Sequence, residues 1–300
     1  MSSLDQAVAP DPAPPPPVAM RTGHITALYK SAYHVIHYNE WGPADAERVV
    51  VCLHSMFQCN AEFDGLARVL GAEGFRVLCP DTAGHGRSGW RRDADEYGYP
   101  LFASDIMAVV ARSGAARVDV VGSSMGGFIS MKMAHEGAPF RTLILNDVGA
   151  YSPKSGPQRV LQNLPPARDY PDAAAIELAL RRLLSASGPL PRAEWVHFVS
   201  RNVARHGNGF RLLYDPRIRR QLVAMTVRDF DLWDKWAAVA CPALVIRGEY
   251  SDMLDADVAQ RMTERPGTEL HTVTGCGHRP WLWTAEQAAP VVEWLKRHPV

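Results

Sequence analysis

The strongest constraint on the fold of this chain is a series of short apolar runs that alternate with helix-like segments. Six runs follow one another, at residues 48–53, 75–79, 117–122, 141–146, 242–248 and 269–273. Several of them are continuous and are bounded by Gly, Pro or Asp, as is typical of strands buried on both faces. An antiparallel hairpin is expected before them, within residues 25–38. This alternation predicts an α/β chain with a mostly parallel central sheet flanked by helices.

Two segments have the apolar spacing of a helix that packs against a core on one face. The two stripes are formed by Phe102, Ile106, Val109 and Val110, and by Ala288, Val291, Val292 and Leu295. Thr284 and Gln287 precede the second stripe with the spacing of a capping box. Pro290 lies inside that segment and predicts a kink or a later start of the helix.

The alternation breaks between about residues 150 and 235, where helical pieces follow one another without a buried strand. They cover 173–184 behind a capping Asp172, 193–205 and 216–225. An all-helical insertion between two parallel strands lies at their carboxyl edge, where open α/β sheets bind ligands. We therefore expect a cap (lid) at 150–235 over a core formed by 21–149 and 236–300, and a disordered Pro-rich tail at 1–20.

Composition and charge exclude several classes of partner. Lys plus Arg equals Asp plus Glu at 32 each, which gives no reason to expect nucleic acid or an anionic membrane. No window approaches the roughly 18 apolar residues of a membrane span, and the N-terminal residues lack the basic and apolar regions of a secretory signal. The five cysteines are odd in number and lack metal-site spacing, which indicates a reducing cytoplasm.

The sequence also lacks the patterns of metal and cofactor sites. It contains no HExxH motif, no phosphate loop of the GxxxxGK type, and no GxGxxG that opens a helix after the first strand. We therefore expect neither a metal nor a cofactor, and a small molecule as the partner.

A tight glycine frame marks the candidate nucleophile. The run at 117–122 leads into Gly122-Ser123-Ser124-Met125-Gly126 and then into a helix-like segment. This is the G-x-S-x-G pattern in its strand–turn–helix context. The turn is so sharp that a Cβ at a flanking position would strike the neighbouring chain. Ser124 has a glycine two positions before it and another two positions after it, whereas Ser123 has Val121 and Met125 at those positions. Ser124 is therefore the predicted nucleophile.

Three further segments accompany the glycine frame: VCLHSMFQ after the strand at 48–53, CPDTAGHGRSGW at 79–90, and the pair RGEYSDML and VTGCGHRPWL near the C-terminus. With these motifs the chain resembles the α/β-hydrolase superfamily, in its lid-bearing carboxylesterase-like branch. The resemblance extends from residue 25 nearly to the end, and it implies a catalytic triad in the chain order Ser, acid, His.

The resemblance implies Ser124 as nucleophile, His278 as base and Asp252 as the acid that orients it. A serine hydroxyl is not nucleophilic at neutral pH without a base, and the base needs a carboxylate to orient it. Asp147, directly after the strand at 141–146, is the competing acid, and Asp252 is preferred because the GEYSDM context matches the commoner arrangement. Glu249 in the same loop is expected to brace the turn.

The resemblance also implies an oxyanion hole formed by the backbone amides of Met56 and Met125. Ser55 stands where relatives usually have glycine. The serine is either a tolerated substitution, which we favour, or its hydroxyl adds a donor or reshapes the acyl pocket. The CPDTAGHGRSGW loop is structural in the family, so Asp81, His85 and Ser88 are interpreted as scaffold and His85 is not expected to be the base.

The substrate pocket is expected to combine residues of the core loops with aromatic residues of the cap. Its candidate residues are Ser55, Phe57, Trp195, Phe198, Tyr214, Arg279 and Trp281. Most cap aromatics are expected to pack the cap onto the core, with one or two lining the pocket. Arg279 either binds a substrate carboxylate or pairs with an acidic residue of the core, and we favour the pairing.

The predicted reaction is hydrolysis of a carboxylic ester of a small to medium acyl substrate through an acyl-enzyme. One alternative is hydrolysis of a carbon–carbon bond in a vinylogous diketone, which this branch performs with the same triad. A second alternative is a non-catalytic hydrolase fold that binds a small ligand, against which the complete set of Ser, His and Asp argues. Epoxide hydrolases and haloalkane dehalogenases place Asp at the position of Ser124, which disfavours their chemistry.

Overall fold

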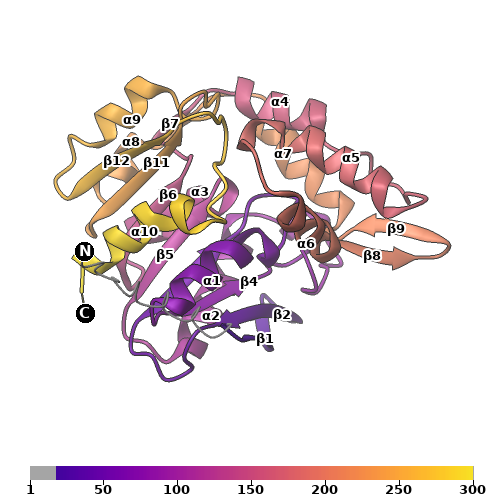
Figure 1. Cartoon of the computed structure of the whole chain (residues 1–300), viewed down its shortest axis with the longest axis horizontal. Coiled ribbons are helices and arrows are strands. Elements are labelled where there is room, and N and C mark those ends of the chain that lie inside the picture. The colour runs from indigo at the N-terminus through magenta and orange to yellow at the C-terminus, as the bar shows by residue number, and fades with distance from the viewer. Residues whose placement is uncertain (1–17, 300) are drawn as a thin grey trace, which may run out of the picture.

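The computed structural model describes residues 18–299, so the predicted tail falls almost entirely outside it. The core is an eight-stranded sheet in the order β1-β2-β4-β3-β5-β6-β11-β12 (Figure 1). Its strands are β1 (Met20–Tyr29), β2 (Ala32–Trp41), β3 (Val49–Leu53), β4 (Arg76–Pro80), β5 (Val118–Ser123), β6 (Phe140–Asn146), β11 (Ala243–Gly248) and β12 (Thr268–Val273). The predicted α/β-hydrolase fold with a mostly parallel sheet is confirmed.

The pairing of the strands follows the sequence pattern. β1 and β2 form the predicted antiparallel hairpin, and β2 also runs antiparallel to β4. The remaining pairs are parallel. Every residue of β3 and of β5 is buried, as expected of apolar runs at the centre of a covered sheet. The carboxyl ends of β3, β5, β6 and β11 therefore meet at one edge of the sheet.

Helices cover both faces of this sheet. α1 (Asp64–Ala72) and α10 (Ala285–Arg297) share one apolar cluster with the sheet. α2 (Tyr99–Ser113), α3 (Met125–His135), α8 (Trp233–Ala237) and α9 (Ala256–Met262) contribute to the other. The two predicted apolar stripes are buried in α2 and α10. Among the helices within residues 18–299, none combines the length and the apolar character needed to cross a membrane.

The start of α10 is fixed by the capping box that the sequence predicts. Thr284 and Gln287 form the predicted capping box, and the helix begins at Ala285. It then continues through Pro290, so the expected later start is wrong, and the expected kink stays a prediction. A proline removes one helical hydrogen bond, but the apolar residues before and after it pack on the sheet and hold this helix in place.

The chain between β6 and β11 forms α4 (Ser155–Asn163), α5 (Ala173–Leu183), α6 (Arg192–Asn202) and α7 (Arg219–Met225), which lie together on one side of the core (Figure 1). Asp172 caps α5 as predicted, accepting a hydrogen bond of 2.8 Å from the Ala175 amide. We call this region the cap. The neck strands β7 (Tyr151–Ser152) and β10 (Phe230–Asp231) pair near the expected limits of 150 and 235, which stay a prediction.

The expectation of an all-helical cap is wrong. Besides the neck strands, the cap contains a hairpin of β8 (Val203–His206) and β9 (Gly209–Leu212). The helix expected over 193–205 ends at Asn202, whose side-chain amide donates to the Phe198 carbonyl at 2.8 Å. Gly207, at φ 54°, makes the turn of the hairpin. The apolar spacing over 193–205 does not indicate that the helix ends at Asn202 and that a hairpin follows.

The loop after β4 has the contacts of a scaffold. The Asp81 carboxylate accepts a 2.7 Å hydrogen bond from the backbone amide of Asn60, and the Ser88 hydroxyl donates to the backbone carbonyl of Asp81 at 2.6 Å. His85 is fully buried, and burial lowers the pKa of its imidazole well below the usual value. These contacts tie the end of β4 to the segment that follows β3, which fits the structural role inferred from the sequence.

Candidate active site

Ser124 lies at the turn between β5 and α3, with φ 48° and ψ −114°. A Cβ at Gly126 would lie 2.1 Å from the Leu53 carbonyl oxygen, and one at Gly122 would lie 2.7 Å from backbone atoms of the next turn. The neighbouring Ser123 is fully buried and its hydroxyl accepts a 3.2 Å hydrogen bond from the Asn146 side chain. Ser124, and not Ser123, therefore lines the cavity at this edge.

Gly126→Ala is expected to destabilise the fold by about 3 kcal/mol, since the clash is with backbone atoms that cannot rotate away. Urea unfolding followed by circular dichroism would measure the loss. Gly98→Ala is the matched control: Gly98 has an extended backbone, and the nearest atom to its Cβ would be 3.9 Å away. That control should lose less than about 1 kcal/mol, the cost of replacing an N-cap glycine. Equal losses in both variants would contradict the steric argument.

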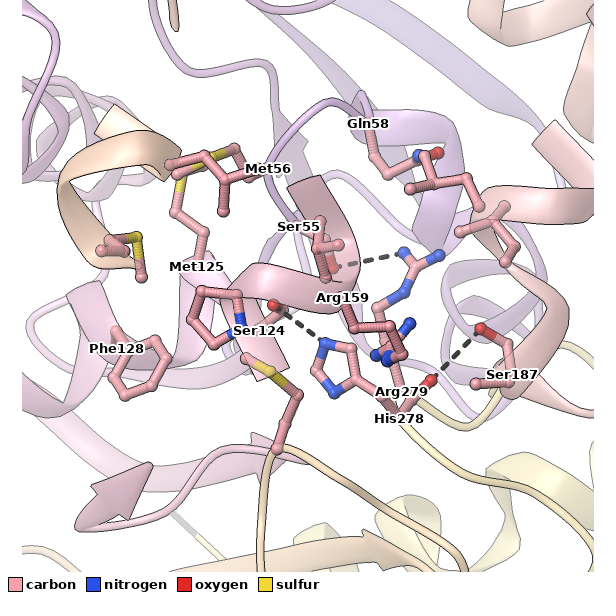
Figure 2. A pocket seen from close by; sticks show the side chains of 18 residues that line it. Ser55, Met56, Gln58, Ser124, Met125, Phe128, Arg159, Ser187, His278 and Arg279 are labelled. Carbon is pink, nitrogen blue, oxygen red and sulfur yellow. Dashed lines mark hydrogen bonds between the residues drawn. The ribbon is translucent and has the colours of Figure 1, made fainter. Parts of the chain in front are cut away.

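His278 lies beside Ser124, as predicted. Its Nε2 is 3.1 Å from the Ser124 hydroxyl (Figure 2), and its Nδ1 is 2.7 Å from a carboxylate oxygen of Asp147. An ionised carboxylate can only accept, so Nδ1 carries the proton and Nε2 is left to accept from the serine. Glu249 accepts from the Gly275 amide at 2.9 Å and so braces the loop that carries His278, as expected.

Asp147 follows β6 directly and is fully buried. One carboxylate oxygen accepts from the Gly248 amide at 2.9 Å, and the other accepts from the Ser251 hydroxyl at 2.6 Å and from His278. These donors satisfy a buried charge that would otherwise be costly. They also hold the carboxylate where it accepts from Nδ1 of His278.

The structure does not bring the predicted acid, Asp252, to His278. The Asp252 carboxylate instead pairs with the guanidinium of Arg159 in α4, with one contact at 2.9 Å, and its side chain is 40 % exposed. Strand order does not explain this, because the histidine loop follows β12, whose neighbour in the sheet is β11 and not β6. The conformation of the β11 loop decides it: the Ser251 hydroxyl donates to Asp147, while Asp252 is directed to Arg159 of the cap. In the β11 loop, Ser251 and not Asp252 turns inward.

Four non-glycine residues with left-handed backbones belong to the segments that form this edge. Phe57, Ser124, Asp147 and Arg279 have φ values of 64°, 48°, 58° and 67°. Within residues 18–299, Lys30 in the first hairpin is the one other non-glycine residue with positive φ. Such strain persists where the surroundings determine it and is concentrated at functional sites. Its concentration here supports the assignment of the site.

A cavity with an empty volume of about 650 Å³, mouth included, opens over Ser124 and His278. Met56 and Met125, the predicted oxyanion-hole residues, both line it. Met125 is the first residue of α3, so its amide has no acceptor within the helix. This position suits a donor to a negative charge that develops on a substrate oxygen.

Of the other predicted pocket residues, Ser55 and Arg279 line the cavity and five do not: Phe57, Trp195, Phe198, Tyr214 and Trp281. Those five are buried in two separate groups between cap and core. Trp195, Phe198 and Trp281 form one, with ring centroids 5.2 Å apart for Phe198–Trp281, and Phe57 and Tyr214 form the other, with ring centroids 5.0 Å apart. Aromatic rings remove a large apolar area from water when they are buried in this way. These residues therefore hold the cap on the core.

Several residues that line the cavity were missed from the sequence: Gln58, Phe128, Arg159, Ser187, Leu222 and Met253. They come from six separate segments, and no local pattern marks them. The position of Phe128, one helical turn beyond the nucleophile, was the one available signal. Among residues 18–299, no group of three or more His, Cys, Asp or Glu side chains is placed to hold a metal ion.

Ser55 and Arg279 share a buried partner. The backbone amide and the hydroxyl of Ser55 donate to the Glu62 carboxylate at 2.8 and 2.9 Å. Arg279 pairs with Glu62 at 2.6 Å and donates to the Ser55 hydroxyl at 3.2 Å. The favoured pairing of Arg279 with a core acid is therefore confirmed. Ser55 does not have positive φ, so serine is unstrained here, and its hydroxyl is part of the wall.

Comparison with known proteins agrees with this architecture. The model of the alpha/beta hydrolase family matches residues 50–294. A 3-hydroxybutyrate-oligomer hydrolase of Cupriavidus necator is 32% identical over 285 residues, which are 90% of this chain and 95% of the relative. A 2-hydroxymuconate semialdehyde hydrolase of Pseudomonas putida is 24% identical over 73% of this chain and 75% of its own. The crystal structure of an alpha/beta hydrolase from Novosphingobium aromaticivorans superimposes with a TM-score of 0.82 at 27% identity, covering 93% of this chain and 98% of that one.

Proposed function

The chain belongs to the alpha/beta hydrolase family, and we propose that it hydrolyses carboxylic esters of small to medium acyl groups through a Ser124–His278–Asp147 triad. The observation that carries the proposal is the continuous hydrogen-bonded path from the Ser124 hydroxyl through both imidazole nitrogens to the buried Asp147 carboxylate. A nucleophile, a base and an orienting acid in hydrogen-bond reach are what acyl transfer requires.

The reaction would proceed in two steps. Ser124 attacks the ester carbonyl while Nε2 of His278 takes its proton, and the amides of Met56 and Met125 stabilise the oxyanion. The same histidine then protonates the leaving alcohol. In the second step His278 takes a proton from water, which attacks the acyl-enzyme. The acyl–oxygen bond to Ser124 then breaks, the imidazolium returns the proton to the serine oxygen, and the acid is released. Asp147 remains ionised throughout and stabilises the imidazolium.

Two relatives suggest where to search for the substrate. The name of the Cupriavidus necator relative points to short oligomers of 3-hydroxybutyrate, in which small acyl groups are joined by ester bonds. We propose such oligomers as the first natural candidates. The Pseudomonas putida relative is named as the hydrolase of a semialdehyde. Because of this relative, we retain carbon–carbon hydrolysis of a vinylogous diketone as the second candidate.

Fluorophosphonate labelling tests the triad, and a p-nitrophenyl ester series of rising chain length tests the reaction. We expect mass spectrometry to locate the adduct on Ser124, and short to medium esters to be hydrolysed well above background. Dimers and trimers of 3-hydroxybutyrate would be compared in the same assay. Folded protein that stays unlabelled would contradict the hydrolase assignment, and labelled protein with background rates on every ester would favour carbon–carbon hydrolysis.

We further propose that the protein acts in the cytoplasm on a small-molecule ester. All five cysteines are free thiols, and three of them, Cys52, Cys59 and Cys79, lie fully inside the core. Burial raises the pKa of the Cys59 and Cys79 thiols well above the usual value, which keeps them unreactive. Free thiols are typical of proteins in a reducing compartment.

A further inference from the structure

The Gln58 side chain lines the cavity without a partner of its own. It is 2 % exposed, and within residues 18–299 neither its carboxamide oxygen nor its nitrogen has a hydrogen-bond partner. A buried amide without partners costs roughly 1–3 kcal/mol in proteins. Since a leucine or methionine would fill the same space without that cost, the carboxamide indicates a polar ligand group in this part of the cavity.

Arg279 provides a second unpartnered group in the same wall. Its Nη1 is engaged by Glu62 and Ser55, whereas its Nη2 is buried and has no acceptor among residues 18–299. Figure 2 shows Gln58 and Arg279 on one side of Ser124 and Phe128 on the other. The cavity therefore has a polar side with free donors and an apolar side, with the nucleophile between them.

The charges of the wall decide which ligand group fits. The guanidinium of Arg279 is neutralised by Glu62, with both side chains about 5 % exposed or less. The other arginine of the cavity, Arg159, is neutralised by Asp252. A substrate carboxylate placed here would find no uncompensated cation, and a buried charge without one is strongly disfavoured. An uncharged oxygen can accept from Gln58 and Arg279 without that penalty.

We propose that the Gln58 carboxamide and Nη2 of Arg279 form a subsite for an uncharged oxygen of the substrate, such as an ether, a hydroxyl or a second ester carbonyl. The inference rests on the proposed ester hydrolysis and specifies it: the preferred substrates carry a second oxygen at a fixed distance from the ester that Ser124 attacks. Plain alkyl esters leave the two donors unsatisfied and are poorer substrates.

An oxygen scan tests the proposal. The probes are p-nitrophenyl hexanoate and its analogues in which one CH₂ is replaced by an ether oxygen at successive positions, with a second set scanned in the alcohol of hexyl butanoate. We expect one position to raise kcat/KM about 10–100-fold over the all-carbon ester, the range for satisfying buried donors. In Gln58→Met that ratio should fall below about 3-fold.

The controls separate the subsite from the chemistry of the probes. Ether oxygens also activate the ester inductively, but that effect persists in Gln58→Met and so does not affect the comparison. Gln158→Met, the same substitution at an exposed glutamine bonded to the Thr226 carbonyl outside the cavity, should keep the wild-type ratio. A flat scan in wild-type protein would overturn the proposal, as would faster turnover of the mono-ester of adipic acid than of the best ether analogue.

A binding measurement distinguishes failure of the subsite from failure of the proposed function. Ser124→Ala would be titrated with the best and the all-carbon ester, with Kd obtained from ligand-observed NMR. A Kd at least 10-fold lower for the oxygen-bearing ester supports the subsite even if the wild-type protein hydrolyses neither compound. Equal Kd values overturn the subsite even if both esters are hydrolysed.

Discussion

Asp147→Asn is expected to lower kcat for ester hydrolysis by about 10³–10⁴-fold, the loss seen when a triad acid becomes an amide. The replacement preserves shape, but the asparagine can present its amide nitrogen toward His278. It then no longer requires the proton on Nδ1, and the tautomer that accepts from Ser124 is lost. The Gly248 and Ser251 donors would also lose an ionised acceptor, so some stability is lost as well.

Asp252→Asn is the matched control for the identity of the acid. Its carboxylate contacts Arg159 on the cap, and we expect less than about a 10-fold change in kcat, since a partly exposed ion pair contributes modestly. Initial rates with p-nitrophenyl butyrate, alongside thermal unfolding of each variant, measure both effects. A larger loss of kcat in Asp252→Asn than in Asp147→Asn would show that the acid in the working enzyme differs from the one in this structure.

Ser124→Ala is expected to lower kcat by about 10⁵–10⁶-fold, because nucleophile and base act as a unit. Adding Asp147→Asn to it should lower the rate little further, since the histidine then has no serine to activate. This non-additivity distinguishes a triad from residues that contribute independently.

Ser123→Ala is the control for this loss. The Ser123 hydroxyl is one residue away but fully buried against Asn146, so its removal should change kcat by less than about 10-fold and stability by about 1 kcal/mol. Both variants would be assayed with the same ester and with fluorophosphonate. Persistent labelling or turnover in Ser124→Ala would reassign the nucleophile.

The features predicted correctly from the sequence depend on residues close together in the chain. Strand and helix positions follow from apolar periodicity, and the capping box at Thr284 and the cap at Asp172 are hydrogen bonds within one turn. Ser124 was identified by the steric need for Gly122 and Gly126 around it. His278 was identified because its segment, VTGCGHRPWL, resembles the motif that carries the histidine in the family.

The acid of the triad and the pocket were decided by the tertiary structure. Asp147 and Asp252 both follow strands at the same edge, and the conformation of the β11 loop, which directs Ser251 to Asp147 and Asp252 to Arg159, leaves Asp147 as the acid that contacts His278. The lack of a hydrogen-bond partner for the Gln58 carboxamide likewise depends on how the cap and the loop of Arg279 pack around it. Short-range sterics and apolar periodicity act between neighbours in the chain, so they can be predicted from the sequence. Loop conformation and cap packing bring together residues that are far apart in the chain, and their separation in sequence carries no signal.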